Sequence, residues 1–266
     1  MTTEQPARPL PSGPGLLVLP ARYTASGALL AQAAEARGMV AEQLPPCRTV
    51  PEWAPAAGPA HLYGGPQFAA AVAPRLGLRL LAPTPDWPVH LPHTFTGRTV
   101  RRMVLAEARA LREPFFAKPR PPAEGTFPAD VYGSGDRLPA DLPGGLPAQV
   151  SEVVAFGAEF RLFLLDGAVR TGSRYATLGR LDPAPLGGCP ELAGVLGFAG
   201  DLVDAIGHTL PRACVLDVGE LLGPGRRRGR WAVVAAGAAW SGHLYASEPD
   251  RALDVVLAST EPASGA

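Results

Sequence analysis

Three charged side chains lie inside apolar stretches of the sequence. Lys118 lies in "FFAKP", Arg161 in "EFRLFLLDG" and Asp217 in "ACVLDVGELL". A charge within an apolar strand is costly unless it meets a partner, so each of these residues must pair with another side chain or with a ligand. A lysine, an arginine and an aspartate in separate strands of one sheet together favour a functional site more strongly than any one of them alone.

Lys118 is the most informative of the three, because it is the only lysine in a chain that otherwise uses arginine. Its ammonium is a compact point charge, which distinguishes it from the planar guanidinium of arginine. A lysine that extends its ammonium into water from the end of a strand is an equally simple interpretation. For Arg161, the simple interpretation is a structural ion pair with the nearby Glu159.

The charge balance and the cysteines exclude several classes of protein. The 24 Lys and Arg balance 24 Asp and Glu, so no basic excess attracts nucleic acid, and the basic run 223–230 is explained as a solvated loop. Cys47, Cys189 and Cys214 fit neither a disulfide framework nor a zinc site, which favours the reducing cytoplasm. No apolar run reaches membrane-spanning length and no signal-peptide layout is visible, so we expect no membrane partner.

The elements that position these residues divide into two parts. In the first part, we expect strands at 15–20, 39–44 and 60–65 and helices at 28–38 and 66–77, which describe a small α/β unit. Ser26 can cap the first helix and Gly38 can end it. A proline-rich linker at 81–92 follows this unit.

The second part reads as an α+β layer, with a mostly antiparallel sheet and helices on one face. Asp166 and Gly167 stand where the turn of a hairpin is expected. We expect strands at 114–119, 148–156, 159–167, 168–175, 213–222 and 230–237, helices at 98–113, 191–210 and 250–259, and an irregular loop with one brief strand at 119–139.

The order of short motifs along the chain resembles one known family. "LYGG", "GRTV", "FFAKP", "FPADVY", "SEVVAFGAEFRLFLLDG", "SRY", "CVLDVGE" and "WAVVAAGAAWSGHLYASEPDRALDVVL" succeed one another between residues 63 and 258. This succession resembles the ATP-grasp superfamily, in the clade named for two arginines and a lysine. The resemblance implies an α+β fold in which two subdomains clamp ATP, preceded by a small α/β domain.

The resemblance also implies domain limits and a reaction. We expect a disordered tail at 1–14, an α/β pre-ATP-grasp domain at 15–92, an ATP-grasp domain at 93–260 and a disordered tail at 261–266. Members of the superfamily typically use ATP to convert a carboxylate to an acyl phosphate, from which an amine then displaces phosphate. The implied partners are therefore a nucleotide and a carboxylate and amine substrate of unknown identity.

The resemblance assigns roles to the residues that match its motifs. Lys118 would hold the ATP phosphates, and Arg161, with Glu159, matches a motif that contacts ribose, phosphate or substrate. Arg161 is the candidate catalytic residue, and Asp217 matches the first magnesium ligand. The stretch that would read the adenine consists of Glu152, Val153 and Val154.

Two departures from the family pattern put catalysis in doubt. Relatives carry a glutamate and an asparagine where this chain has Ala235 and Gly237. Period-2 alternation places both on one strand face beside the aspartate, but a methyl group and a hydrogen cannot ligate Mg²⁺. The second lysine that relatives carry before "FPADVY" is also missing, with only Arg120 or Arg137 as substitutes.

These departures leave several functions open. The chain is expected to be an ATP-binding protein that resembles carboxylate–amine ligases with reduced activity, its Mg²⁺ site weak or lost unless Glu220 assists Asp217. The alternative is a catalytically inactive pseudo-enzyme that binds nucleotide or serves as a scaffold. An unrelated structural protein is a third class. His243 and Tyr245 could serve either of the first two, although His243 is more simply a surface histidine, because no nucleophile is identifiable beside it.

Overall fold

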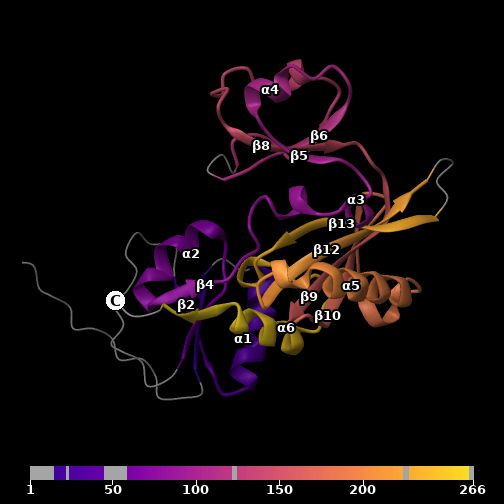
Figure 1. Cartoon of the computed structure of the whole chain (residues 1–266). Helices are drawn as coiled ribbons and strands as arrows, with labels where there is room; N and C mark the ends of the chain where they lie inside the picture. Colours follow the sequence, from indigo (N-terminus) through magenta and orange to yellow (C-terminus); the bar gives the residue numbers. More distant parts are fainter. Residues whose placement is uncertain (1–14, 22–23, 45–58, 122–124, 224–227, 264–266) are drawn as a thin grey trace, which may run out of the picture.

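The computed structural model describes residues 15–21, 24–44, 59–121, 125–223 and 228–263. An N-terminal α/β unit, a small sheet and a large sheet make up the molecule (Figure 1). The predicted tail at 1–14, Cys47 and residues 224–227 of the basic run lie outside the described residues. Within those residues, no helix is long and apolar enough to cross a membrane.

The N-terminal unit is a parallel sheet with the strand order β2-β1-β3. Its strands are β1 (Leu16–Pro20), β2 (Val40–Leu44) and β3 (Ala60–Leu62), and its helices are α1 (Ala25–Ala36) and α2 (Pro66–Val72). Parallel neighbours need a crossover connection, which α1 supplies between β1 and β2. The predicted α/β order of this region is therefore confirmed.

The first helix begins earlier than predicted, because its cap is a different residue. Thr24 accepts a hydrogen bond from the backbone N–H of Gly27 at 3.1 Å, the usual arrangement at a helix N-terminus. Ser26, the predicted cap, is buried. Its hydroxyl oxygen instead accepts a hydrogen bond from the backbone N–H of Leu244 at 2.9 Å, a long-range contact that the local sequence does not reveal.

The small sheet is antiparallel, with the order β5-β8-β6-β7. Its strands are β5 (Val100–Val104), β6 (Phe115–Pro119), β7 (Asp130–Tyr132) and β8 (Pro147–Glu152). Helix α4 (Leu105–Arg109) packs on one face, where Leu105 and Ala108 join the apolar core of this part. The opposite face carries polar groups.

The predicted helix at 98–113 is wrong over its first half. Val100–Val104 forms β5, which pairs with β8 along its whole length, and only Leu105–Arg109 is α-helical. The apolar residues of this segment fit helical spacing, but pairing with a neighbouring strand outweighed that local preference.

The large sheet is antiparallel, with the order β11-β10-β9-β12-β13. Its strands are β9 (Phe156–Leu165), β10 (Ala168–Thr177), β11 (Arg180–Pro185), β12 (Ala213–Leu222) and β13 (Arg228–Gly237). The turn between β9 and β10 has positive φ at both Asp166 and Gly167, which suits a tight hairpin and confirms the predicted turn.

Helices cover both faces of the large sheet, whereas the sequence predicts helices on one face. Helix α5 (Leu192–Ile206) packs with Phe160, Leu162 and other side chains on one face. Helix α6 (Pro249–Ala258) and α1 pack with Phe163 on the opposite face. The N-terminal unit thus shares a core with the large sheet.

The C-terminal strand returns to the first part of the chain. Strand β14 (Thr260–Pro262) pairs with β4 (Leu78–Leu80), so Glu261 and Pro262 belong to a strand in the region predicted as a tail. The remaining short elements are α3 (His93–Thr96) and 3-10 turns at Pro74–Leu76, Trp87–His90, Gly135–Arg137, Leu186–Gly188, Gly207–Thr209 and Ala239–Ser241.

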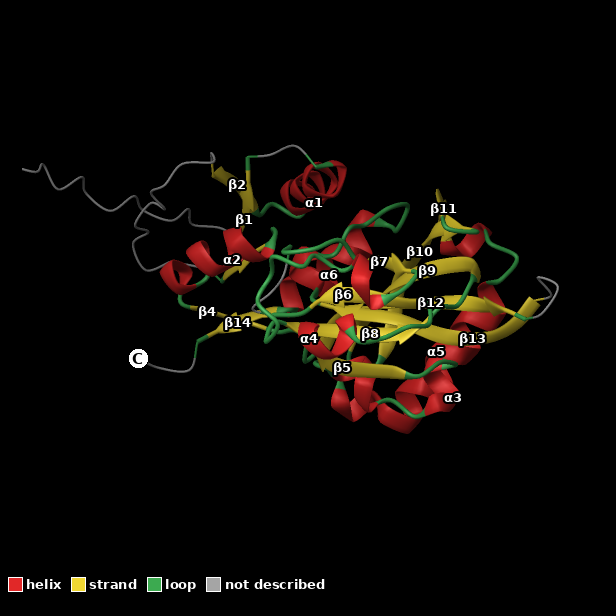
Figure 2. Cartoon of the chain, turned by 90° about the horizontal axis from the view of Figure 1, so that it is seen from above, coloured by secondary structure: helices red, strands yellow, loops and turns green. Residues whose placement is uncertain are grey.

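The small sheet lies over the β12–β13 side of the large sheet in both views of the chain (Figure 1 and Figure 2). Gly97, in the left-handed region, joins the two, and a Cβ there would meet Leu221 Cδ1 at 2.2 Å. The next residue, Arg98, is buried and donates to the carbonyl oxygen of Val233 at 2.8 Å. This junction fixes the polar face of the small sheet opposite the large sheet.

Candidate nucleotide-binding site

Arg161 and Asp217 face each other across neighbouring strands of the large sheet. They are register partners on β9 and β12, and Arg161 Nε and Nη2 donate to the two Asp217 carboxylate oxygens at 2.8 Å and 2.7 Å. Burial acts to lower the pKa of Arg161, but the bond to Asp217 outweighs it and leaves that pKa raised. A two-pronged ion pair of this kind is strong and directional, so each group has its partner within the protein.

Two tyrosines complete a cluster around this pair. The Arg161 guanidinium lies 5.3 Å from the centre of the Tyr245 ring, and Tyr245 stacks on Tyr175 at 5.2 Å. The Tyr175 hydroxyl donates to Glu159 at 2.8 Å. Burial, and then the charge of Asp217, raise the pKa of the Glu159 carboxyl. We call Glu159, Arg161, Tyr175, Asp217 and Tyr245 the arginine–tyrosine cluster.

Ala235 lies directly opposite Asp217 in the register of β12 and β13. Gly237 lies opposite Val215, two residues further along both strands, and Ala236 between them packs toward the core around α5. Ala235 and Gly237 therefore share the Asp217 face, as the alternation of the strand predicts.

The residues around Asp217 do not fit a tightly bound Mg²⁺. Ala235 offers a methyl group, Gly237 has no side chain, and both Asp217 oxygens are engaged by Arg161. Among the described residues, no three His, Cys, Asp or Glu side chains form a group that could hold a metal ion. Because Mg²⁺ requires oxygen ligands in near-octahedral geometry, this face offers a poor site for it.

Lys118 projects from the small sheet toward this face. It is partly buried on β6. Burial, followed by the charges of Arg120 and Arg98, lowers its pKa to about 8, while the charge of Asp217 opposes the shift. Within the described part of the chain, the Lys118 ammonium has no hydrogen bond or ion pair with another side chain. Its charge is thus available to an anion, and its role in holding phosphate stays a prediction.

A pocket of about 330 Å³ lies where β8 passes into β9. Its walls combine apolar side chains with polar atoms, and Glu159 supplies the charged group. Val153 and Val154 lie outside regular strands, and their backbone groups make no hydrogen bonds with other described residues. The lining residues are Val154, Ala155, Phe156, Glu159, Leu178, Gly179 and Leu222.

Glu152 lies at the edge of this region, and its side chain makes hydrogen bonds within the protein. Its carboxylate accepts hydrogen bonds from the backbone N–H and the hydroxyl of Thr99 at 2.9 Å and 3.2 Å. The bond from the Thr99 backbone is the main reason that the pKa of Glu152 is lowered. Glu152 therefore ties the start of β5 to the end of β8 through its carboxylate.

The sequence profile of an ATP-grasp domain matches residues 95–255, namely family 2 of the clade named for two arginines and a lysine. The chain belongs to the ATP-grasp family. No curated protein matches the sequence significantly. Solved structures with the same fold include a RimK-domain ATP-grasp protein from Sphaerobacter thermophilus, which is 17% identical with a TM-score of 0.56 over 91% of this chain and 99% of that one.

Two further similar structures are ligases or synthetases by name. N5-carboxyaminoimidazole synthetase from Staphylococcus aureus is 12% identical, with a TM-score of 0.55 over 96% of this chain and 81% of that one. D-alanine–D-alanine ligase from Bacillus anthracis is 10% identical, with a TM-score of 0.54 over 92% and 96% of the two chains. At these identities the similarity establishes the α+β ATP-grasp fold.

Tyr175 and Arg98 of this ATP-grasp protein were missed in the sequence, and Tyr245 was a candidate without an identified partner. Tyr175 and Tyr245 stand in motifs that carried the resemblance, yet nothing in their spacing indicates that they stack across β10 and a distant loop. Arg98, in "GRTV", is buried with its guanidinium 5.6 Å from the centre of the Phe156 ring. The signal for Arg98 was an arginine directly after a glycine at the entry to an apolar strand.

The remaining candidates fall in different places. Arg120 lies close enough to Lys118 for its charge to lower the pKa of that lysine, whereas Arg137 is exposed on a 3-10 turn. Glu220 is buried, with a carboxylate oxygen beside Gly157. His243 is exposed, as the surface interpretation predicts.

Proposed function

We propose that this ATP-grasp protein binds ATP between its two sheets and that its ligase chemistry is reduced or lost. The observation that carries the proposal is that Arg161 donates hydrogen bonds to both carboxylate oxygens of Asp217. Ala235, which lies opposite Asp217, supplies only a methyl group. The cation beside Asp217 is then a guanidinium of the protein, and nucleotide binding depends little on Mg²⁺.

The nucleotide itself has complementary groups on the small sheet and in the pocket where β8 passes into β9. An ammonium in an apolar setting is strongly attracted to phosphate, and Lys118 has no competing side-chain partner among the described residues. The pocket at Val154 and Phe156 offers apolar walls for a planar base, next to backbone groups at Val153 and Val154 that can pair with its edge. A synthetase with the same fold is known in complex with ADP.

Loss of the magnesium ligands weakens catalysis more than binding. A divalent ion neutralises charge that develops on the transferred phosphoryl group, and this contribution is realised in the transition state. For Asp217 to hold Mg²⁺, its bond to Arg161 must first open, and the ion must then take most of its ligands from phosphate and water. The roles of Arg161 in catalysis and of Asp217 in metal binding are therefore the least supported of the assigned roles.

Slow ligase activity is the second candidate, and one observation favours it. Glu159 lies on the same strand as Arg161, and its pKa responds to the charge of Asp217, so two carboxylates lie near each other on this face. If Arg161 turned toward a substrate, Asp217 and Glu159 could hold a cation together. The reaction would transfer the terminal phosphoryl group of ATP to a carboxylate, and an amine would then displace phosphate to form an amide.

The proposed setting is the cytoplasm, with small molecules as partners. Cys189 and Cys214 are free thiols in buried positions, which suits a reducing compartment. The balanced formal charge gives no support to a nucleic-acid partner.

Calorimetric titration with ATP, in EDTA and in excess Mg²⁺, tests the proposal. We expect wild-type protein to bind ATP in both conditions with dissociation constants within about threefold of each other. Lys118→Ala should weaken binding by about tenfold or more, while Arg101→Ala, a change on an exposed side chain of β5, should leave it unchanged. Binding only in the presence of Mg²⁺ would contradict the proposal and favour the ligase.

A further inference from the structure

Lys118 carries the only ε-amino group of the chain. Its strand, β6, turns Phe115 and Ala117 into the core around α4, so Lys118 lies on the opposite face of the small sheet. The side chain is partly buried, and among the described residues its nitrogen has no hydrogen bond or ion pair with another side chain. A partly desolvated amine without an anionic partner is the setting in which a lysine becomes a nucleophile.

Charged groups from three elements face Lys118. Arg120 on its own strand and Arg98 at the junction before β5 are positive, whereas Asp217 on β12 is negative. Burial is the main reason that the pKa of Lys118 is lowered to about 8, and each arginine charge acts on it more strongly than the charge of Asp217 does. A sizeable fraction of Lys118 is therefore a neutral amine near neutral pH, and the neutral amine is the form that attacks an electrophile.

A buried hydrogen-bond acceptor lies on the same face as this amine. Gln149 on β8 is the register partner of Lys118, so the two side chains are neighbours across the strands. Gln149 is 2% exposed, and its Oε1 has no hydrogen-bond partner among the described residues. A buried acceptor without a donor is costly. The N–H of an amide formed on Lys118 would supply the donor that this oxygen lacks.

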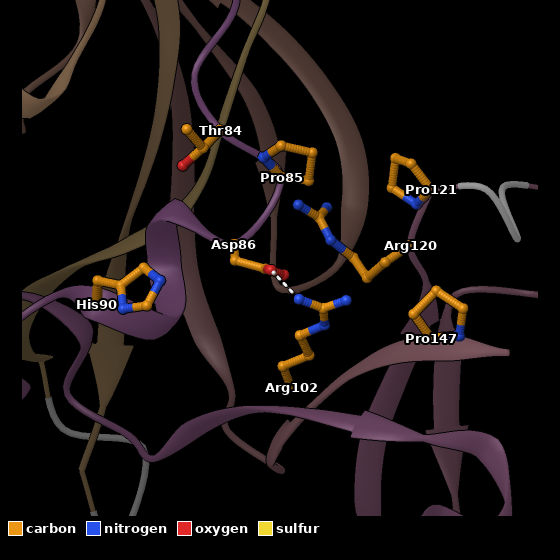
Figure 3. Close-up of a pocket in the computed structure, with 8 residues that line it drawn as sticks. All are labelled: Thr84, Pro85, Asp86, His90, Arg102, Arg120, Pro121 and Pro147. Carbon is orange, nitrogen blue, oxygen red and sulfur yellow. Dashed lines mark hydrogen bonds and ion pairs between the residues drawn. The ribbon is translucent and has the colours of Figure 1, made fainter. Parts of the chain in front are cut away.

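A second pocket, of about 500 Å³, gives small molecules a route to this face from the side of the proline-rich linker. Figure 3 shows Arg102 and Arg120 with their guanidinium groups turned into this space beside Asp86. Arg102 is the register partner of Gln149, and Arg120 follows Lys118 by two residues, or roughly 7 Å along an extended chain. Both arginines therefore emerge on the Lys118 face, and a small molecule in the pocket lies next to that lysine.

We propose that Lys118 is a site of covalent modification, which takes its acyl group from a small acyl phosphate that enters through this pocket. The neutral amine attacks the carbonyl carbon, so that a C–N bond forms and the C–O bond to the phosphate breaks. The phosphate leaves with the electron pair of that bond and takes up one proton from the attacking nitrogen. The products are an amide on Lys118 and inorganic phosphate. Because the positive charges that act on Lys118 outweigh the negative one, an anionic acyl donor is attracted more strongly than a neutral donor.

Acylation replaces the only ammonium of the small sheet with a neutral amide. It therefore removes the group that is proposed to hold the ATP phosphates, and a bound phosphate in turn keeps Lys118 protonated and unreactive. This consequence for nucleotide binding rests on the proposed function, whereas the acylation of Lys118 does not.

Acetylation of the whole protein by acetyl phosphate tests the proposal, with peptide masses to locate each acetyl group. The variant Arg101→Lys supplies a matched control in the same molecule, because Arg101 is exposed and lies on the α4 face of β5. We expect Lys118 to be acetylated at least about tenfold faster than the introduced lysine at about pH 7.5, and this advantage to disappear in urea. Lys118→Arg should take up no acetyl group at this position.

The pH profile, the acyl donor and ATP separate the possible outcomes. The rate at Lys118 should level off above about pH 8, whereas the rate at the introduced lysine should rise until about its ordinary pKa of 10.5. Equal rates at the two lysines, an advantage that persists in urea, or an equal advantage with the neutral donor acetic anhydride would overturn the proposal. Saturating ATP should slow acetylation of Lys118 alone. ATP that binds without this protection, or that does not bind, would contradict the proposed function and leave the acetylation rates standing.

Discussion

The two sheets that face each other differ in whether their charged residues have partners within the protein. On the large sheet, Arg161, Asp217, Tyr175 and Glu159 use one another as partners. On the small sheet, the charge of Lys118 meets no opposing side chain at bonding distance among the described residues, and its pKa is lowered by burial and by neighbouring arginines. Charged groups that pair with one another within the protein are part of the folded structure. A partly buried cation without such a partner binds an anionic ligand strongly.

In the proposed function, this difference separates the half of the site that binds nucleotide phosphate from the half that has lost its catalytic role. The small sheet presents the Lys118 ammonium, while the large sheet carries Ala235 opposite Asp217 and has the Tyr245 ring beside the Arg161 guanidinium. If phosphate binding draws on the small sheet and phosphoryl transfer on the large sheet, as we propose, one can be lost while the other persists.

The largest expected effect is on stability, from removal of the buried arginine. Arg161→Ala should lower the free energy of unfolding by about 3 kcal/mol, because it leaves Asp217 buried without its partner. Arg212 provides a matched control, since it makes the same two-pronged contact with Asp166 at 2.9 Å and 3.0 Å but at the surface. Arg212→Ala should cost much less, because an ion pair open to water contributes little to stability. Urea denaturation of both variants measures the difference, and equal costs would show that the cluster does not depend on its burial.

The next effect is on the pH dependence of ATP binding. Because the pKa of Lys118 is lowered to about 8, an increasing fraction of this side chain is a neutral amine above that pH. Binding of ATP phosphate to the charged form then requires Lys118 to take up a proton. The affinity for ATP should fall by up to about tenfold per pH unit above the pKa. Titrations between about pH 7 and pH 9.5 test this, with Lys118→Ala as the variant whose affinity should be independent of pH in this window.

The stability of the protein should change with pH in the opposite direction to its affinity for ATP. Between the lowered pKa of folded Lys118, about 8, and its ordinary value of 10.5, the unfolded chain binds more protons than the folded chain. Stability without nucleotide should therefore rise with pH across this window relative to Lys118→Met. A fall in the relative stability across the same window would show that the lysine is not desolvated.

The smallest expected effect comes from one hydrogen bond within the cluster. Tyr175→Phe removes the donor to Glu159 and should lower the free energy of unfolding by about 1 kcal/mol. Because the ring and its stacking on Tyr245 remain, ATP affinity should not change. Thermal denaturation and ATP titration of this variant provide both readings, and a large loss of affinity would place Tyr175 in contact with nucleotide.

Features that depend on local pattern were predictable from the sequence. The alternation along β13 placed Ala235 and Gly237 on the Asp217 face, and apolar runs predicted helix α5 and the strands of the large sheet other than β11, which was missed. Asp166 and Gly167 predicted the hairpin, because few dipeptides suit positive φ at both positions.

Features that depend on contacts across space were not predictable. The strand β5 was read as a helix, because its pairing with β8 lies far along the chain. The stacking of Tyr175 on Tyr245 and the ion pair of Arg161 with Asp217 depend on which strands become neighbours. The charged residues were identified individually, but the sequence did not show that Arg161 and Asp217 would form an ion pair with each other.

Restoration of the two family residues at β13 tests the central claim most directly. A Cβ at Gly237 would meet Val215 Cγ2 at 3.4 Å, so a side chain can be placed there, and Ala235 already lies opposite Asp217. The measurement is the ATP dissociation constant of wild type and of the Ala235→Glu, Gly237→Asn double variant, each in EDTA and across a Mg²⁺ series. We predict little Mg²⁺ dependence for wild type and at least about tenfold tighter binding with Mg²⁺ for the double variant. Equal Mg²⁺ dependence in the two proteins would contradict the claim that these positions have lost a metal site.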